Sequence, residues 1–258
     1  MERENAVKTL NTEDTPSRVV LLTGAAGGLG EAFALRLAQD GHTLLLSDRL
    51  GCGPLVERIR AAGGQAIELR CDLADATQVR VLAEQALAVA GRVDVLVNNA
   101  AFMPMAALPT LDLTLWRTIM AVNVEAPLLL AQAVAPQMAQ RGWGRIVNLA
   151  SSTTWGPPPG MSAYATSKMA VIGLTRALAS ELGGQGITVN AISPGLTRHA
   201  GSAAHLPAQA FEGVRARQFI PRTEEPEDLT GPLAFLVSEA SRFVTGQVLN
   251  VDGGGFGF

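Results

Sequence analysis

The chain is short of aromatic side chains, and Tyr164 is its only tyrosine. Aromatic residues make up 5% of the 258 residues and charged residues 17%, with a net charge of −3. Proteins that bind nucleic acid through its phosphates need clustered positive charge. This small negative balance therefore argues against nucleic acid as the main partner.

Cysteine is equally scarce. Cys52 and Cys71 are the only two, and their spacing matches neither a metal site nor a redox pair, so we interpret them as free thiols in a reducing cytoplasm and expect no metal. Residues 1–17 lack the apolar centre of a signal peptide, and no later run is long enough and free enough of charge to span a bilayer. We expect a flexible tail over residues 1–17, a cytoplasmic protein and no membrane partner.

Short apolar runs alternate with longer helical patterns from Arg18 onward. Most of the short runs are continuous in Val, Ile and Leu, which is typical of parallel strands covered on both faces. The predicted strands span residues 18–23, 43–48, 66–70, 93–99, 144–151, 186–193 and 246–252. The pattern predicts a Rossmann-type, doubly wound α/β fold: a seven-stranded parallel sheet with helices on both faces, in a single domain over residues 18–258.

Glycines and small polar residues follow the predicted strands. After successive strands the chain reads "GAAGGLG", "DR", "CD", "NNAA", "SST" and "SPG". Parallel strands end at the same edge of a sheet, and ligands bind outside that edge where the strand order reverses. We therefore expect these loops to form one site.

The first loop has the features of a dinucleotide site. Gly24 allows a tight turn, Gly28 and Gly30 allow close backbone approach, and the helix that follows offers free N–H groups to a pyrophosphate. Asp48 follows the second strand, and a carboxylate there can accept hydrogen bonds from ribose hydroxyls and repel a 2′-phosphate. Arg49, which follows Asp48, favours NADP instead, because a guanidinium can pair with that phosphate. We favour NAD over NADP because Gly27, before Gly28, brings no second cation.

Tyr164 and Lys168 are four residues apart in a predicted helix, so they lie about 40° apart around its axis. A free phenol has a pKa of about 10 and is a poor base at neutral pH. A neighbouring ammonium favours the phenolate, so we expect the pKa of Tyr164 to fall below that value. The pair indicates general acid/base chemistry, although a solvated amphipathic stripe would have the same spacing.

The motifs "TGAAGGLG", "NNAA", "SAYATSK" and "SPG" together resemble the short-chain dehydrogenase/reductase family, in its single-domain TGxxxGxG/YxxxK branch, over residues 18–258. The resemblance implies an NAD(P)-dependent oxidoreductase that is a homotetramer. It implies a catalytic set of Asn123, Ser151, Tyr164 and Lys168, with Ser151 rather than Ser152 chosen because it precedes Tyr164 by thirteen positions. The cofactor contacts that it implies are Gly24, Gly28, Leu29, Gly30, Asp48, Asp72, Leu73, Asn99, Ala100, Tyr164, Lys168, Pro194, Gly195 and Thr197.

The chain departs from that family pattern at two positions. Ala101 replaces the usual glycine of the fourth-strand motif, and His199 stands where a threonine or serine is usual. Loop histidines are usually solvated, so we expect no catalytic role for His199.

The segments expected around the substrate, "AFMPMAAL" and "TTWGPPPGM", are rich in Met, Pro and Trp and contain no Arg or Lys. These segments favour an apolar secondary alcohol or ketone as the substrate. An equal alternative is that their side chains only pack the core beneath the loops. The segment "GWGRIVNLAS" and Trp155 resemble family members that act on aryl carbinols, such as 1-phenylethanol dehydrogenase. The Gly- and Ala-rich stretch from His199 to Val214 resembles the family's mobile lid.

Two other functions stay open from the sequence. A 3-oxoacyl-thioester (acyl carrier protein) reductase would need NADPH and a basic patch for its acidic carrier. A non-catalytic dinucleotide-binding regulator would keep the glycines without needing Ser151, Tyr164 and Lys168.

Overall fold

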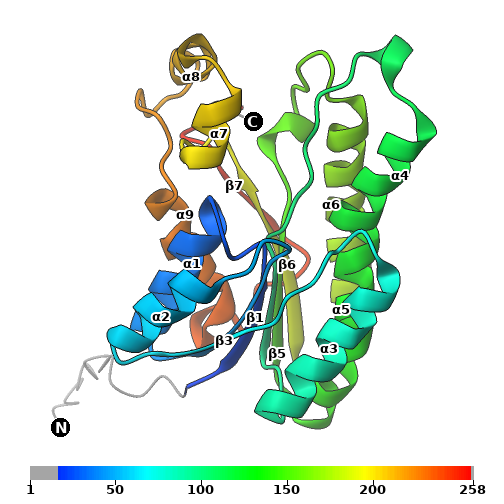
Figure 1. The fold of residues 1–258 in the computed structure, drawn as a ribbon, viewed down its shortest axis with the longest axis vertical. Helices are drawn as coiled ribbons and strands as arrows, with labels where there is room; N and C mark the ends of the chain where they lie inside the picture. The colour runs from blue at the N-terminus through cyan, green and yellow to red at the C-terminus, as the bar shows by residue number, and fades with distance from the viewer. Residues whose placement is uncertain (1–16, 257–258) are drawn as a thin grey trace, which may run out of the picture.

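The structure is a computed structural model that describes residues 17–256, so the predicted tail lies almost wholly outside the described residues. A seven-stranded parallel sheet runs through the centre (Figure 1). Its strands are β1 (Val19–Thr23), β2 (Thr43–Ser47), β3 (Gln65–Glu68), β4 (Val95–Asn98), β5 (Gly144–Leu149), β6 (Ile187–Pro194) and β7 (Val248–Val251). The strand order is β3-β2-β1-β4-β5-β6-β7, which confirms the predicted doubly wound sheet.

Helices cover both faces of the sheet, as predicted (Figure 1). The α-helices are α1 (Leu29–Gln39), α2 (Gly53–Ala61), α3 (Ala76–Ala90), α4 (Leu113–Met120), α5 (Ala126–Gln140), α6 (Ser162–Leu182), α7 (Ala200–His205), α8 (Ala208–Arg215) and α9 (Glu227–Val237). Helix α3 shows how the local sequence sets the bounds. Asp75 caps its start by accepting from the backbone N–H groups of Thr77 and Gln78, and Gly91 ends it in the left-handed conformation.

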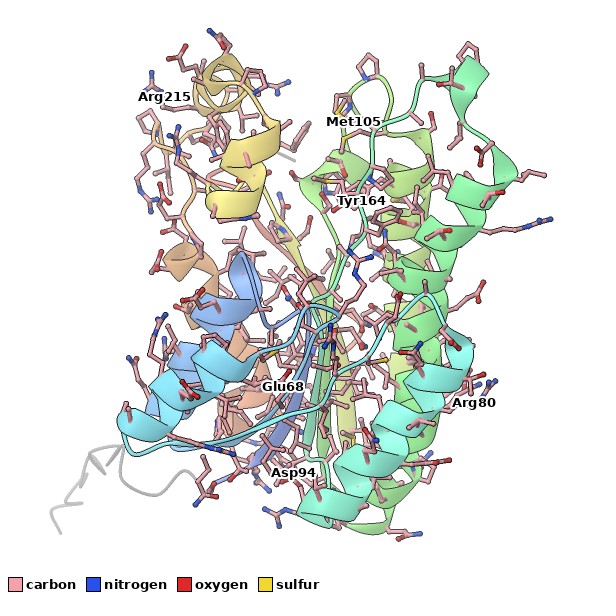
Figure 2. The ribbon with its side chains drawn as sticks, viewed as in Figure 1. Glu68, Arg80, Asp94, Met105, Tyr164 and Arg215 are labelled. Carbon is pink, nitrogen blue, oxygen red and sulfur yellow. The ribbon has the colours of Figure 1, made fainter. Side chains whose placement is uncertain are left out.

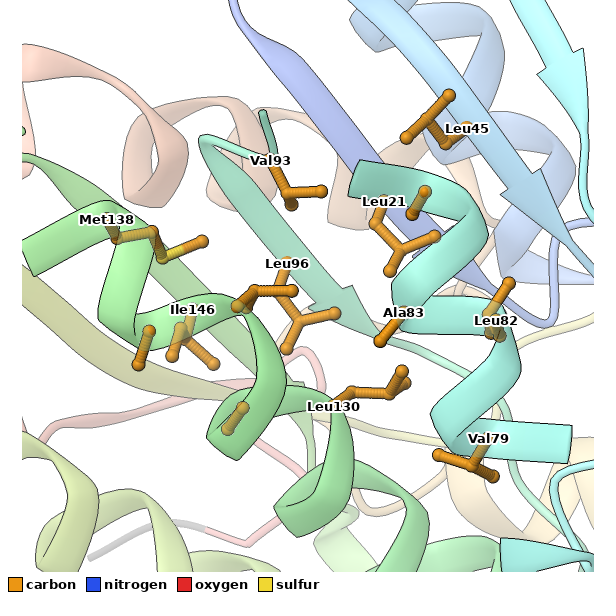
Figure 3. Packing of buried hydrophobic residues seen from close by; sticks show 14 of the residues in the cluster. Leu21, Leu45, Val79, Leu82, Ala83, Val93, Leu96, Leu130, Met138 and Ile146 are labelled. Atoms are coloured by element: carbon orange, nitrogen blue, oxygen red, sulfur yellow. The ribbon is translucent and has the colours of Figure 1, made fainter. Parts of the chain in front are cut away.

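The five central strands bury both of their faces, which explains their continuous apolar runs, whereas the edge strands β3 and β7 are partly exposed. Leu21, Leu45, Leu96 and Ile146 pack against α3 and α5 on one face (Figure 3). The residues between them in the strands point to the other face and pack against α1, α2 and α9. The sheet is thereby held rigid between two apolar layers.

One helical stretch differs from expectation. Residues Leu113–Gln140 run through α4, a π-helical turn η3 (Ala121–Glu125) and α5, and by length and composition alone they could cross a membrane. The sequence analysis expected no such run. Part of this stretch is buried in the protein core, where Leu130, Val134 and Met138 pack against the sheet. The core helix of a globular protein passes the same test, so this property is weak evidence for a membrane span.

Candidate active site

The strand order reverses between β1 and β4, and the glycine and polar loops gather at the carboxyl ends of the strands near this point. Tyr164 lies on α6, and Met105 lies above it on the same side of the molecule (Figure 2). Helices α7 and α8 rise on the opposite side (Figure 1). The loops that the sequence analysis selected therefore border one site.

The glycine-rich turn after β1 is braced by the loop after β4. Gly24 has a φ of +65°, and a Cβ there would lie 2.7 Å from Cα of Ala100, so only glycine fits. The side-chain amide of Asn99 donates to the carbonyl oxygens of Thr23 and Gly24, at 3.0 and 2.9 Å. The side chain of Asn99 thus supports the glycine-rich turn by binding the backbone of that turn.

The same turn leads into α1 with an open N-terminus. Gly28 is the N-cap of α1, has a φ of +53° and provides no side-chain cap. Backbone N–H groups of the first helical turn, to which Leu29 and Gly30 belong, can therefore face an anion, although the N–H of Gly30 donates to the carbonyl of Gly27 at 3.0 Å. These residues fit the pyrophosphate of a dinucleotide.

Asp48 lies at the end of β2 with its carboxylate already held. It accepts from the backbone N–H of Ala26 at 3.1 Å and from that of Leu50 at 2.9 Å. The structure corrects one premise of the cofactor assignment, because a second cation is present. Arg70, after β3, donates to the backbone carbonyl of Arg49 at 2.9 Å, so two guanidinium groups are attached to this loop.

Asp72 and Leu73, after β3, are half-buried in the next loop of the site. One carboxylate oxygen of Asp72 accepts from the backbone N–H of Ala74 at 3.0 Å, which holds this loop in place. Leu73 packs against the apolar core.

Three of the four catalytic candidates lie at the end of β5 and on α6. Tyr164 and Lys168 are both buried on α6, with 7% and 2% of their surfaces exposed, and Ser151 at the end of β5 is 8% exposed. Ser151 hydrogen-bonds the phenol of Tyr164. The Nζ of Lys168 donates to the carbonyl of Leu149 at 2.6 Å and lies 5.7 Å from the centre of the Tyr164 ring.

Burial reverses the expected direction of the phenol's pKa. In the chain without cofactor, burial raises the pKa of Tyr164 to about 12, although the hydrogen bond with Ser151 acts in the opposite direction. Burial also lowers the pKa of Lys168 to about 8. Loss of solvation thus outweighs the attraction of an ammonium that is bonded to Leu149 rather than to the phenol. A phenolate at this position needs a further positive charge nearby.

Asn123 belongs to the π-helical turn η3, not to a regular α-helix. Its amide donates to the carbonyl of Phe102 at 3.1 Å and to the hydroxyl of Ser167 at 2.9 Å, and its carbonyl accepts from the N–H of Phe102 at 2.8 Å. No hydrogen bond joins the side chains of Asn123 and Lys168, both of which the structure describes. Asn123 therefore ties the loop after β4 to α6, and the catalytic role that the resemblance implied for it stays a prediction.

A buried carboxylate that the sequence analysis missed, between α8 and α9, contacts the loop after β6. Glu224 accepts from the backbone N–H of Gly195 at 3.0 Å and from the hydroxyl of Thr197 at 2.6 Å. Burial raises the pKa of Glu224 to about 7, although these two hydrogen bonds act in the opposite direction. The run "TEEPED" resembles a solvated helix start, so no sequence signal marked this residue. Glu224 holds the Pro194–Gly195 loop, and the Thr197 hydroxyl donates to it instead of facing outward.

The raised pKa of Glu224 predicts a pH-dependent stability. The folded chain keeps a proton on this carboxyl at a pH where the unfolded chain, with its ordinary pKa of 4.5, has lost it. The stabilisation is fully present below about pH 4.5 and is lost as the pH rises through about 7. Glu224→Gln should therefore raise the free energy of unfolding by on the order of 2 kcal/mol at pH 8.

Denaturant unfolding at pH 5 and pH 8 measures this effect, and the gain from Glu224→Gln should shrink at pH 5. Glu225→Gln is the matched control, because Glu225 is exposed and adjacent. An equal gain at both pH values would contradict the protonation of Glu224.

Neither the cysteines nor a group of metal ligands adds a further reactive site to the described residues. Cys52 and Cys71 are free and buried, and burial raises the pKa of their thiols to about 12 and about 11. Both are poor nucleophiles at neutral pH. Among residues 17–256 no group of three His, Cys, Asp or Glu side chains could hold a metal ion.

Comparisons with known proteins agree with this geometry. A family model described as enoyl-(acyl carrier protein) reductase matches residues 24–255. The (2S)-[(R)-hydroxy(phenyl)methyl]succinyl-CoA dehydrogenase subunit BbsD of Thauera aromatica is 38% identical over 92% of this chain and 96% of its own length.

Solved structures give the same result. A gluconate 5-dehydrogenase from Burkholderia cenocepacia, in complex with NADP and tartrate, superposes with a TM-score of 0.86 at 33% identity, over 92% of this chain and 94% of its own. A 3-oxoacyl-(acyl-carrier-protein) reductase from Agrobacterium tumefaciens with NADP bound superposes with a TM-score of 0.85 at 33% identity, over 92% and 93%.

The open turn at α1, the buried Ser151–Tyr164–Lys168 group and these near full-length matches lead to one conclusion. The chain belongs to the short-chain dehydrogenase/reductase family and is an oxidoreductase that uses NAD(P) and acts on a CH–OH group or a ketone.

Proposed function

We propose that the substrate is an apolar secondary alcohol or the corresponding ketone, with aryl carbinols as the leading class. The observation that carries this proposal is the apolar border beside Tyr164. Met103, Met105 and Trp155 are each more than two-fifths exposed, although large apolar side chains are normally buried. Met105 and Tyr164 lie on the same side of the molecule (Figure 2), and the Met105 loop contacts the turn before α6 through the N–H of Ala106, which donates to the carbonyl of Gly160 at 2.9 Å. The Thauera relative supports the proposal, since its name describes a hydroxyl group on a carbon that bears a phenyl ring.

The residues of this chain supply the acid/base part of the reaction. In the oxidation direction Tyr164, as phenolate, takes the hydroxyl proton of the alcohol, and Ser151 donates a hydrogen bond to the same oxygen. Lys168 places a positive charge below the phenol. Nicotinamide, when bound, accepts the hydride in one direction and returns it in the other. The apolar border excludes water from the reacting atoms.

A second candidate is reduction of a 3-oxoacyl thioester on an acyl carrier protein. The Agrobacterium relative supports it by name, and the description of the family model names the same carrier protein but an enoyl reductase. Arg215, at the end of α8, lies on the opposite side of the view from Tyr164 (Figure 2), and both Arg215 and the nearby Arg217 are exposed and could meet an acidic carrier. A non-catalytic regulator is the weakest alternative, because the catalytic side chains are present and buried together.

A substrate panel distinguishes these functions. Purified protein is supplied with NAD or NADP and either 1-phenylethanol, aliphatic secondary alcohols or gluconate, and in reverse with a 3-oxoacyl thioester and NADPH or NADH. We expect the highest kcat/KM for the aryl carbinol. Faster turnover of the carrier-bound thioester than of any free alcohol would contradict the proposal, and no turnover with any substrate would favour the regulator.

We propose that NAD is preferred to NADP because the fixed carboxylate of Asp48 would repel a 2′-phosphate. Asp48→Ala removes this repulsion and leaves Arg49 and Arg70 free to attract the 2′-phosphate. The ratio of NADP affinity to NAD affinity should therefore rise by about tenfold or more, the effect of removing about 1.4 kcal/mol of repulsion.

Fluorescence titration of both cofactors measures that ratio. Asp40→Ala changes the net charge equally and is the control, since Asp40 pairs with Arg36 at the far end of α1. Tighter NADP than NAD binding by the unmodified protein would overturn the assignment of Asp48.

We also propose the homotetramer that the family resemblance implied and the cytoplasmic location that the free cysteines indicated. Light scattering on the purified protein at micromolar concentration reports the assembly directly.

A further inference from the structure

His199 lies against the dinucleotide turn, not in solvent as the sequence analysis expected. A Cβ built on Gly28 would lie 3.1 Å from Nδ1 and Cε1 of His199 and 3.3 Å from its Nε2. Because these three distances are nearly equal, the face of the imidazole ring lies over the backbone of Gly28, the residue that caps α1. Figure 1 shows α7, which begins just after His199, lying above the start of α1. The segment over the site thus touches the phosphate-binding turn through this one ring.

The cap of α7 sets which ring nitrogen of His199 carries the proton. Nδ1 accepts from the backbone N–H of Ser202 at 3.3 Å, so it has no hydrogen in this arrangement. The Ser202 hydroxyl accepts from the backbone N–H of His199 at 3.0 Å and donates to the carbonyl of Thr197 at 2.8 Å. The neutral ring then carries its hydrogen on Nε2. Nε2 makes no hydrogen bond within the part of the chain that the structure describes.

Two features of the site therefore point the same way. The open N-terminus of α1 offers backbone N–H groups to an anion, and the Nε2–H of His199 is an unused donor beside the first of them. Burial lowers the pKa of His199, so at neutral pH the ring acts as a neutral donor rather than as a cation.

We propose that His199 is a cofactor-binding residue whose Nε2–H donates to the pyrophosphate of the dinucleotide at Gly28, and that this contact fastens α7 to the dinucleotide turn. The proposal rests on the binding of NAD(P) at α1. A residue in this loop could instead contact the nicotinamide end of the cofactor, and the test below distinguishes the two contacts.

The test compares three ligands that contain different parts of the cofactor. NAD has both a pyrophosphate and a nicotinamide, ADP-ribose has only the pyrophosphate, and adenosine has neither. Calorimetry measures the affinity of the intact protein for each ligand, without turnover. His199→Asn is the first variant, since Asn can accept from the Ser202 N–H as an N-cap but is too short to reach across Gly28.

His199→Asn should weaken NAD and ADP-ribose by a similar factor of about ten and leave adenosine unchanged, because a hydrogen bond to a charged group is lost. His199→Gln, which places an amide donor farther out, should recover part of the loss. Thermal melting of both variants checks that the fold is intact.

Weaker binding of NAD with unchanged ADP-ribose would overturn the proposal, because it would place His199 at the nicotinamide end. Tighter binding of ADP-ribose by His199→Asn would also overturn it, because the ring would then obstruct the phosphate site. Equal weakening of adenosine would mean a general loss of structure at the turn and would equally count against a pyrophosphate contact.

Discussion

Tyr164→Phe should reduce the rate of hydride transfer by on the order of a thousandfold while NAD still binds. Phenylalanine fills the same buried space but cannot accept the proton of the alcohol, and a positioned acid/base group commonly contributes factors of about 10² to 10⁴. Single-turnover formation of NADH measures the chemical step, and calorimetry measures cofactor affinity. Turnover within about tenfold of the unmodified protein would leave the mechanism without its base.

Because Tyr164 is the only tyrosine, the ultraviolet change on phenolate formation reports its ionisation alone. Without cofactor the midpoint should lie above the ordinary value of about 10, since burial raises the pKa of Tyr164 to about 12. NAD should lower the midpoint, because its nicotinamide ring is positive and favours the phenolate. NADH is the matched control, with a neutral ring, and should lower it less.

Lys168→Met should raise the midpoint further with NAD bound, since one positive charge below the phenol is removed. Circular dichroism at each pH establishes that the fold persists. A midpoint that neither cofactor nor Lys168→Met moves would show that Tyr164 is not coupled to the site's charges.

Ser151→Ala should lose a factor of about a hundred to a thousand in kcat, the usual cost of removing one donor to a developing oxyanion. In the structure the Ser151 oxygen accepts from the N–H and the hydroxyl of Thr153, at 3.3 and 2.9 Å. Its own hydrogen is therefore left to donate to a substrate oxygen or to the phenol.

Ser152→Ala is the matched control, and we expect only a small loss. Ser152 is also buried, but its backbone carbonyl accepts from the N–H of Trp155, a contact that alanine keeps. If Ser152→Ala were the damaging variant, the catalytic serine would be displaced by one residue from the position that its spacing to Tyr164 indicates.

The sequence by itself determined the parts of this protein that depend on local pattern. Continuous Val, Ile and Leu runs predicted the seven strands, because a strand covered on both faces needs apolar residues at every position. The four-residue spacing of Tyr164 and Lys168 predicted that they share a face of α6. The predicted strand ends placed the "SST" loop at the same site, and the family resemblance selected Ser151 within it. The glycine turn before α1 was predicted in the same way.

Only the tertiary structure decided the pKa values and the contacts of these groups, because solvation and long-range contacts cannot be predicted from any short stretch of the chain. The expected fall in the pKa of Tyr164 became a rise once the phenol was buried and Lys168 was bonded to Leu149. Arg70, Glu224 and His199 meet the site across separations in sequence of 21, 29 and 171 residues, to Arg49, Gly195 and Gly28. The free energy of an ionisable group depends on what surrounds it in space, and that surrounding exists only after the chain has folded.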